Sequence, residues 1–156
     1  MLSLLLALLI PAHSADLSES ILGIPWGPAP TIDALPGECQ PDDDSTAIGR
    51  CTMEVGGVPV DVLWHATGGE LAAVAISTTG GDCVALLAVV EGAWGRGRPT
   101  VPGARSVLDP RSWKAGPIIA SWRTGAGRVC QVAAADMGAL KRAKAAGLEA
   151  GASSGL

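Results

Sequence analysis

Apolar and polar residues alternate along three successive stretches near the middle of the chain. Side chains of a strand point to opposite faces in turn, so the alternation predicts strands at Cys51–Val55, Val60–His65 and Leu71–Ser77. Glycine pairs separate the stretches, at Gly56-Gly57 and Gly68-Gly69. Such pairs accept the backbone angles of tight turns, and the sequence therefore predicts an antiparallel sheet of consecutive hairpins.

A helical spacing of apolar residues replaces the alternation after Gly81. The residues that recur at the spacing of one helix face are Cys83, Leu87, Val90 and Trp94. Asp82 can cap the first turn, and Gly95 follows as a residue that ends helices. The pattern predicts a helix that begins after Asp82 and ends at Trp94.

The second half of the chain returns to strand-like patterns. The predicted segments are Arg111–Lys114, Ile118–Arg123 and Arg128–Ala134. Asp136 can cap a last helix to about Ala146, and Thr31 can cap a short helix through Leu35. We therefore predict an α+β fold, with an antiparallel sheet of about six strands and the helices packed on one face.

The chain resembles itself when it is shifted by 58 residues. The aligned pairs include Trp64 with Trp122, Val74 with Val132 and Ala75 with Ala133. These positions form a large anchoring side chain and one strand face, which a shared backbone would constrain. We predict two related halves, about 21–77 and 82–134, each a helix followed by three strands. The alternative is a chance likeness between two Trp-containing hairpins.

The alternation also assigns the faces of the predicted sheet. Val60, Val62 and Trp64 share one face, which we expect to be the core face. Asp61, Leu63 and His65 share the opposite face. The 58-residue shift places Cys130 on the core face of its own strand, so that Cys130 and Cys83 both point inward.

The N-terminus carries an apolar run, Leu2 to Ile10, followed by small residues up to Ala15. This arrangement is typical of a secretory signal peptide, which we predict at 1–15. The remaining chain is predicted to form a single domain at 16–146 with a flexible tail at 147–156, located in the periplasm or outside the cell. The run is about 10 residues long, whereas a membrane span needs about 20, so we expect no span.

Four cysteines follow the leader, and an even number in an exported chain indicates disulfides. Four cysteines allow three pairings, of which we favour Cys39–Cys51 and Cys83–Cys130. A zinc site would need close pairs such as Cys-x-x-Cys, and the sequence has none.

Composition narrows the classes of partner. The net charge is −4, and without clustered Lys and Arg the chain offers no attraction for nucleic acid. There is no Phe and no Tyr, so five Trp residues supply all the aromatic volume. We expect most of these Trp side chains to lie in the core.

Candidate reactive groups are few, and no cofactor is predicted. His65 is the only histidine after the leader, and Asp61, four residues away along a strand, would be about 13 Å distant. The acidic run Asp42-Asp43-Asp44 lacks the ligand spacing of a calcium loop. Arg96 and Arg98 are predicted to form a small basic patch, and with Trp113 they make a possible binding surface.

Several segments resemble those of small exported bacterial α/β modules. They are Gly23-Ile24-Pro25-Trp26-Gly27, the helix start at Thr31, the span from Cys39 to Cys51, and Gly68 to Val74. The chain is similar in these segments to outer-membrane-assembly lipoproteins of the SmpA/OmlA type and to the β-lactamase inhibitor protein family. The likeness covers residues 21–77 well and 82–134 loosely.

The resemblance implies a tandem α/β repeat with local disulfides and a non-catalytic role. The chain departs from both groups, because it lacks the lipid-attachment cysteine of the lipoproteins and the aromatic-rich sheet face of the inhibitors. The resemblance therefore implies no particular partner.

These observations together predict an exported, disulfide-stabilised, non-catalytic binding module that contacts another protein in the cell envelope or outside the cell. One alternative is a hydrolase that acts on envelope polymers through carboxylates the sequence does not identify. The other is a structural envelope protein.

Overall fold

The structure, a computed structural model, describes residues 16–28, 38–41, 48–79, 82–103, 106–125 and 129–147, with the backbone alone at 38–41 and Thr79. The predicted signal peptide, the short helix at 31–35, the acidic run at 42–44 and the tail from 148 onward lie outside the described residues.

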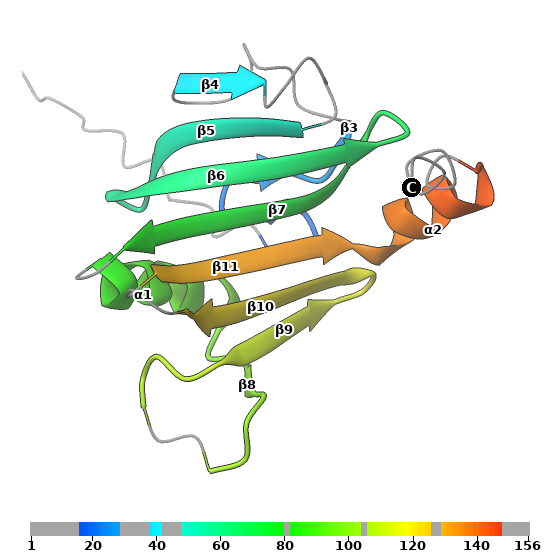
Figure 1. Ribbon diagram of the computed structural model, residues 1–156. Coiled ribbons are helices and arrows are strands. Elements are labelled where there is room, and N and C mark those ends of the chain that lie inside the picture. The colour runs from blue at the N-terminus through cyan, green and yellow to red at the C-terminus, as the bar shows by residue number, and fades with distance from the viewer. Residues whose placement is uncertain are drawn as a thin grey trace, which may run out of the picture.

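One antiparallel sheet dominates the described chain (Figure 1). Its order is β4 (Glu38–Pro41), β5 (Ile48–Val55), β6 (Val58–Thr67), β7 (Glu70–Thr79), β11 (Val129–Asp136), β10 (Ile118–Thr124), β9 (Arg111–Ala115) and β8 (Arg98–Pro99). The strands of each half follow one another as hairpins, and the two halves meet where β7 pairs with β11. The predicted class, α+β with an antiparallel sheet, is confirmed.

The sheet has eight strands along this path rather than the predicted six. The additional strands are β4 and β8, which lie outside all the predicted strands. Both are short and contain proline, and neither shows an apolar alternation. Each adopts the strand conformation because it pairs with a stronger neighbour, β5 or β9.

Three short strands precede the sheet: β1 (Ser20–Ile21), β2 (Ile24–Pro25) and β3 (Gly27–Pro28). β1 and β2 form a small hairpin, and β3 pairs with the start of β7. Leu17, Ile21 and Ile24 are buried in the core. The segment therefore adds apolar volume to the same core as the sheet.

The two helices have different positions. α1 (Asp82–Trp94) buries Cys83, Leu86, Leu87 and Val90 in the core beside β6 and β7. α2 (Met137–Ala145) lies beyond the strand ends (Figure 1), so the expectation that both helices cover one face is wrong for α2. Asp136 caps α2 as predicted, because its side chain accepts from the backbone N–H groups of Gly138 and Ala139.

The predicted assignment of strand faces is confirmed. Val60, Val62 and Trp64 are buried on the side of α1, whereas Leu63 is 40% exposed on the opposite face. All five Trp side chains lie in the core or pack against it. The aromatic volume of the chain is thus structural.

The pairing registers of the two halves match under the 58-residue shift. Trp64 pairs with Val74 between β6 and β7, and Trp122 pairs with Val132 between β10 and β11. Ala75 pairs directly with Ala133, its own counterpart under the shift. An approximate two-fold axis therefore passes through the sheet between these two alanines.

A disulfide joins Cys83 of α1 to Cys130 of β11, as predicted, with 5.8 Å between the two Cα atoms. Cys39 lies directly opposite Cys51 in the pairing of β4 with β5. The Cys39 side chain is outside the described part, so the Cys39–Cys51 bond stays a prediction. Within the ranges given above, no helix combines the length and apolarity needed to cross a membrane.

Candidate functional site

The sheet face opposite α1 is left uncovered by the described elements (Figure 1). Its centre is floored by small residues of the two middle strands. These are Ala73 and Ala75 of β7 and Ala133 and Ala135 of β11, which pair across the strands as Ala73 with Ala135 and Ala75 with Ala133. Alanine ends at Cβ, so the middle of this face lies lower than its two sides.

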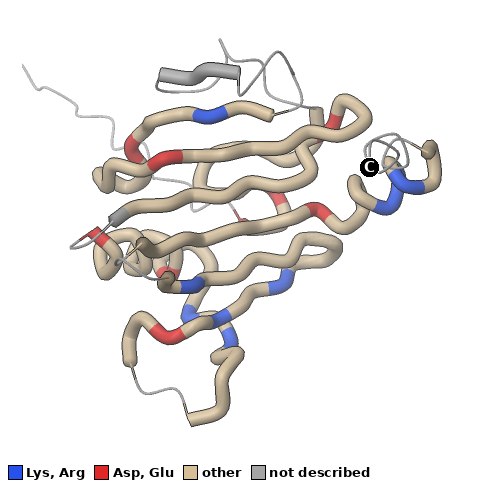
Figure 2. The backbone as a smooth tube through the Cα atoms, viewed as in Figure 1, with Lys and Arg blue, Asp and Glu red and all other residues tan. Residues whose placement is uncertain are grey.

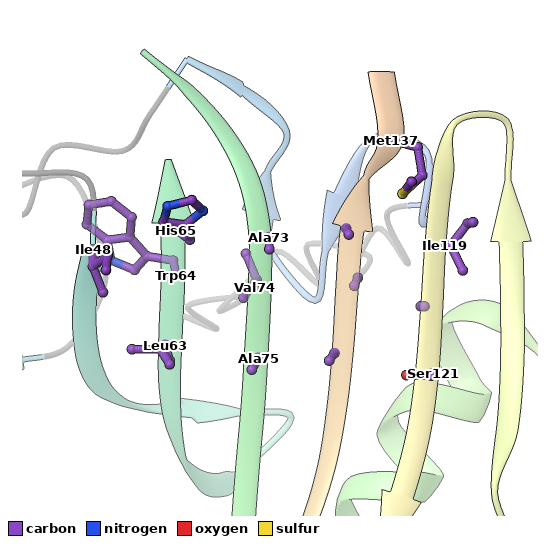
Figure 3. Close-up of a pocket in the computed structure, with 14 residues that line it drawn as sticks. Ile48, Leu63, Trp64, His65, Ala73, Val74, Ala75, Ile119, Ser121 and Met137 are labelled. Carbon is purple, nitrogen blue, oxygen red and sulfur yellow. The ribbon is translucent and has the colours of Figure 1, made fainter. Parts of the chain in front are cut away.

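Larger side chains border the floor on both sides (Figure 3). Leu63 and His65 of β6 form one ridge, and Ile119 and Ser121 of β10 form the other. Met137, the first residue of α2, lies at the end of the hollow near Ile119. We call this hollow the alanine trough; its volume is about 490 Å³.

A polar row closes one end of the alanine trough. The strand registers place Asp61, Ser77, Gln131 and Arg123 side by side across β6, β7, β11 and β10. Arg123 donates to the Gln131 side-chain oxygen from Nε at 3.1 Å and from Nη2 at 2.8 Å. Thr52 donates to Asp61 at 3.4 Å.

The opposite end of the trough opens into a basic hollow of about 350 Å³. Lys114 of β9 and Lys141 of α2 line it, together with Ile119 and Met137, which it shares with the trough. Lys114 lies directly opposite Ile119 in the pairing of β9 with β10. Both lysines are exposed, and the structure shows no ion pair for either within its described residues.

Glu70 is an acidic group on β7 that contacts α2, and it is already engaged. Arg142 donates to both of its carboxylate oxygens at 2.9 Å. These hydrogen bonds are the main reason that the pKa of Glu70 lies below its ordinary value; the charge of Arg142 adds to the effect and desolvation opposes it. Glu70 therefore does not neutralise the two lysines.

The structure brings two of the three predicted binding-surface residues together. Arg98 and Trp113 line a cleft at the β8–β9 edge with Trp94 and Lys114, whereas Arg96 does not line it. Trp113 is only 7% exposed, and its indole N–H donates to the carbonyl of Gly95 at 3.0 Å. A binding role for Arg96, Arg98 and Trp113 stays a prediction.

Reactive groups are sparse on the described surface. Exposed His65 lies on the trough ridge, and Asp61 lies four residues away on the same strand, as expected. Asp61 and Asp82 line one hollow of about 210 Å³, and both are exposed. Within the described ranges no three His, Cys, Asp or Glu side chains come together as metal ligands.

The alanine trough was not anticipated from the sequence. The available signal was the alanine content of the open-face positions in both middle strands, together with the 58-residue shift, which superposes Ala75 on Ala133. Alanine is common in many contexts, so only the pairing of β7 with β11 shows that the four residues form one floor.

No protein family, curated protein or solved structure matches this chain. The functional argument therefore starts from the geometry described above.

Proposed function

We propose that this chain is an exported, disulfide-stabilised, non-catalytic binding module that binds another protein on its open sheet face. The observation that carries the proposal is the alanine trough, an apolar hollow at the centre of that face. Leu63, Ile119 and Met137 border it and are 40%, 44% and 38% exposed. A contiguous exposed apolar patch of this kind marks interaction sites in water-exposed proteins.

The scaffold suits binding because it is rigid. The trough is built on the four central strands, and the Cys83–Cys130 disulfide ties α1 to β11 behind it. A preformed surface loses little conformational entropy when a partner binds. The floor and ridges of the trough offer apolar surface to a partner, and the charged groups at its ends can fix the direction in which the partner lies.

The disulfide is consistent with an oxidising compartment, which supports the exported location. The resemblance to exported tandem α/β modules also supports a non-catalytic role. In the β-lactamase inhibitor protein family an aromatic-rich sheet face is expected to contact the target. In this chain the residues proposed to contact the partner are aliphatic, because the open face carries Ala, Leu and Ile.

Site-specific photo-crosslinking in producing cells tests the proposal. The photoreactive residue p-benzoylphenylalanine replaces Leu63 or Ile119 in the trough, and in matched controls it replaces Val84 or Val107. The controls are also exposed aliphatic residues, at 59% and 69%, but they lie away from the trough.

We expect one protein adduct of defined mass from both trough positions and from neither control. Equal adducts at all four positions, or no adduct at Leu63 and Ile119 in a protein that folds and is exported, would reject the open face as the binding surface.

The hydrolase alternative has one observation in its favour, the hollow that Asp61 and Asp82 share. Glycoside hydrolysis uses two carboxyl groups flanking the bond, one of them commonly held protonated by burial. If the chain were such a hydrolase, purified protein incubated with cell-wall polymer would release reducing ends. Asp61→Asn and Asp82→Asn would then each abolish the release. We expect no release, since both carboxylates are exposed.

A further inference from the structure

We propose that the element that fills the alanine trough is an amphipathic α-helix of the partner protein, with carboxylates in its last turn held between Lys114 and Lys141. The inference rests on the proposed function and specifies the partner for the same site. It follows from the width, the length and the charges of the trough.

The width of the trough matches a helix. Its ridges are β6 and β10, and β7 and β11 lie between them. Three inter-strand spacings separate the ridges by about 14 Å. A helix with its side chains is about 10–12 Å across, so it would touch both ridges, whereas a single extended strand would leave most of the floor uncovered.

The floor permits close contact. Each of its four alanines presents a methyl group to the open face, and all four residues are half-buried. Large side chains on the helix, such as leucine, can enter the space between the ridges. Ridge residues Leu63 and Ile119 then pack against the sides of the helix.

The length of the trough sets the length of the helix. The trough runs along β11 from Gln131 in the polar row to Met137 at the start of α2. This path covers six residues, so the trough is about 20 Å long. A helix rises about 1.5 Å per residue, so about 13 residues would span the trough.

Charge sets the direction of the helix. Lys114 and Lys141 are exposed at one end, and Arg142 already engages Glu70, the acidic group on neighbouring β7. A helix C-terminus carries partial negative charge, and acidic residues in the last turn add to it. At the other end the charges of exposed Asp61 and Arg123 balance, because Gln131, which accepts from Arg123, is neutral; the two lysines alone therefore set the direction.

Figure 2 shows the distribution that makes this direction favourable. Apart from Arg50, the Lys and Arg residues among those described all follow α1 in the sequence and belong to β8–β11, their connections and α2. The acidic Glu54 and Asp61 belong to β5 and β6. This distribution distinguishes the two sides of the sheet; along the trough, Lys114 and Lys141 make one end positive, whereas Asp61 and Arg123 balance at the other.

A second copy of this chain suits the trough less well. Two copies that face each other with their floors aligned would oppose alanine methyl groups to alanine methyl groups and ridge to ridge, which leaves the centre of both troughs unfilled. α1 is also unavailable as the occupant, because its apolar face is buried in the core.

Fluorescein-labelled synthetic peptides of about 14 residues, long enough to span the trough, test the inference by fluorescence anisotropy with the mature chain at low salt. The first peptide has leucine and alanine on one helical face, glutamine elsewhere and glutamate in the last turn. The second has lysine in place of that glutamate. The third repeats the first with a central proline, which breaks the helix.

Two protein variants carry matched controls. Ala75→Leu fills the floor of the trough, and Ala85→Leu makes the same change at an exposed position of α1. Lys114→Glu combined with Lys141→Glu reverses the charge of the basic hollow. Its control is Lys144→Glu, which changes a lysine of α2 that does not line the hollow.

We expect the glutamate-ended peptide to bind about ten-fold more tightly than the lysine-ended peptide, and the Lys114→Glu, Lys141→Glu variant to reverse that order. Ala75→Leu should abolish binding, the proline peptide should not bind, and both controls should behave as the parent protein.

Equal binding of the two charged peptides would overturn the direction of the helix, and tight binding of the proline peptide would overturn the helix itself. Dimerisation in sedimentation that Ala75→Leu abolishes would assign the trough to a second copy. If the peptides fail to bind while Leu63 and Ile119 still crosslink one protein, the helix inference fails and the proposed function stands. If the crosslinks are also absent, both fail.

Discussion

Trp64 and Trp122 occupy matching positions in the two halves, but their indole N–H groups differ. The Trp122 N–H donates to the carbonyl of Leu108 at 3.2 Å, whereas the buried N–H of Trp64 has no hydrogen-bond partner among the described residues. An unpaired buried donor costs about 1–3 kcal/mol of folding free energy. The two residues therefore offer a matched comparison of equal packing with unequal hydrogen bonding.

We expect Trp122→Phe to lower the free energy of unfolding by about 1 kcal/mol more than Trp64→Phe. Both substitutions remove similar buried apolar area, but only the first removes a hydrogen bond, and the second removes an unpaired donor. Urea unfolding followed by circular dichroism measures both values. Equal losses would show that the Trp64 N–H is paired in solution.

Gly49 is a position where only glycine fits. It pairs with Trp64 across β5 and β6, and a Cβ added at Gly49 would overlap the Trp64 indole. Gly49→Ala should lower stability by about 1–3 kcal/mol, since overpacking moves side chains and backbone. Gly92 of α1 is the control: open space surrounds its missing Cβ, so Gly92→Ala should raise stability by about 0.5–1 kcal/mol. Thermal unfolding of both variants tests the contrast.

The Glu70–Arg142 pair links β7 to α2 and predicts a pH effect. Hydrogen bonds from Arg142 lower the pKa of Glu70 in the folded protein. The stabilisation from this pair is therefore fully present at a pH above the pKa that Glu70 has in the unfolded chain. It is lost as the pH falls through the lowered folded-state pKa. Arg142→Gln should raise the pKa of Glu70 toward its ordinary value, as measured by NMR titration of the carboxyl carbon. An unchanged pKa would show that the pair does not form in solution.

At the scale of elements, local patterns predicted most of the sheet. The six strands β5–β7 and β9–β11 were each predicted within a few residues. Their apolar residues alternate with polar ones, and glycine-containing turns separate several of them. β4 and β8 were missed because their strand conformation comes from pairing with neighbours. The predicted position of α2 was wrong, because an amphipathic pattern indicates that one helix face is buried but does not show which part of the protein covers it.

The Cys83–Cys130 disulfide is a covalent link within the second half of the chain. It joins residues 47 positions apart and ties α1 to the central strand β11. Replacing both cysteines with alanine should lower the free energy of unfolding by about 4 kcal/mol, because the unfolded chain regains the entropy that the closed loop removes. Guanidinium unfolding of the double variant measures the change. A loss of under about 1 kcal/mol would show that packing alone holds α1 against the sheet.

At the scale of the whole molecule, the proposed binding surface lies where the two halves meet. Neither half contains the alanine trough, since its floor takes two alanines from β7 and two from β11. Its ridges likewise combine β6 of the first half with β10 of the second, whereas its basic end comes from β9 and α2, which both follow the first half. The proposed site therefore depends on the pairing of β7 with β11, and its integrity can be followed by the crosslinking positions Leu63 and Ile119.

The sequence by itself determined the strands β5–β7 and β9–β11, the core face, the Trp-based core and α1, because alternation, helical spacing and turn residues act over short distances along the chain. It favoured the Cys83–Cys130 pairing among three possible ones, and the tertiary structure decided it. The tertiary structure alone decided the order of the strands, the place of α2 and the existence of the trough. These depend on which residues distant in sequence become neighbours, and Ala75 and Ala133, 58 positions apart, become direct partners only when the two hairpin systems join.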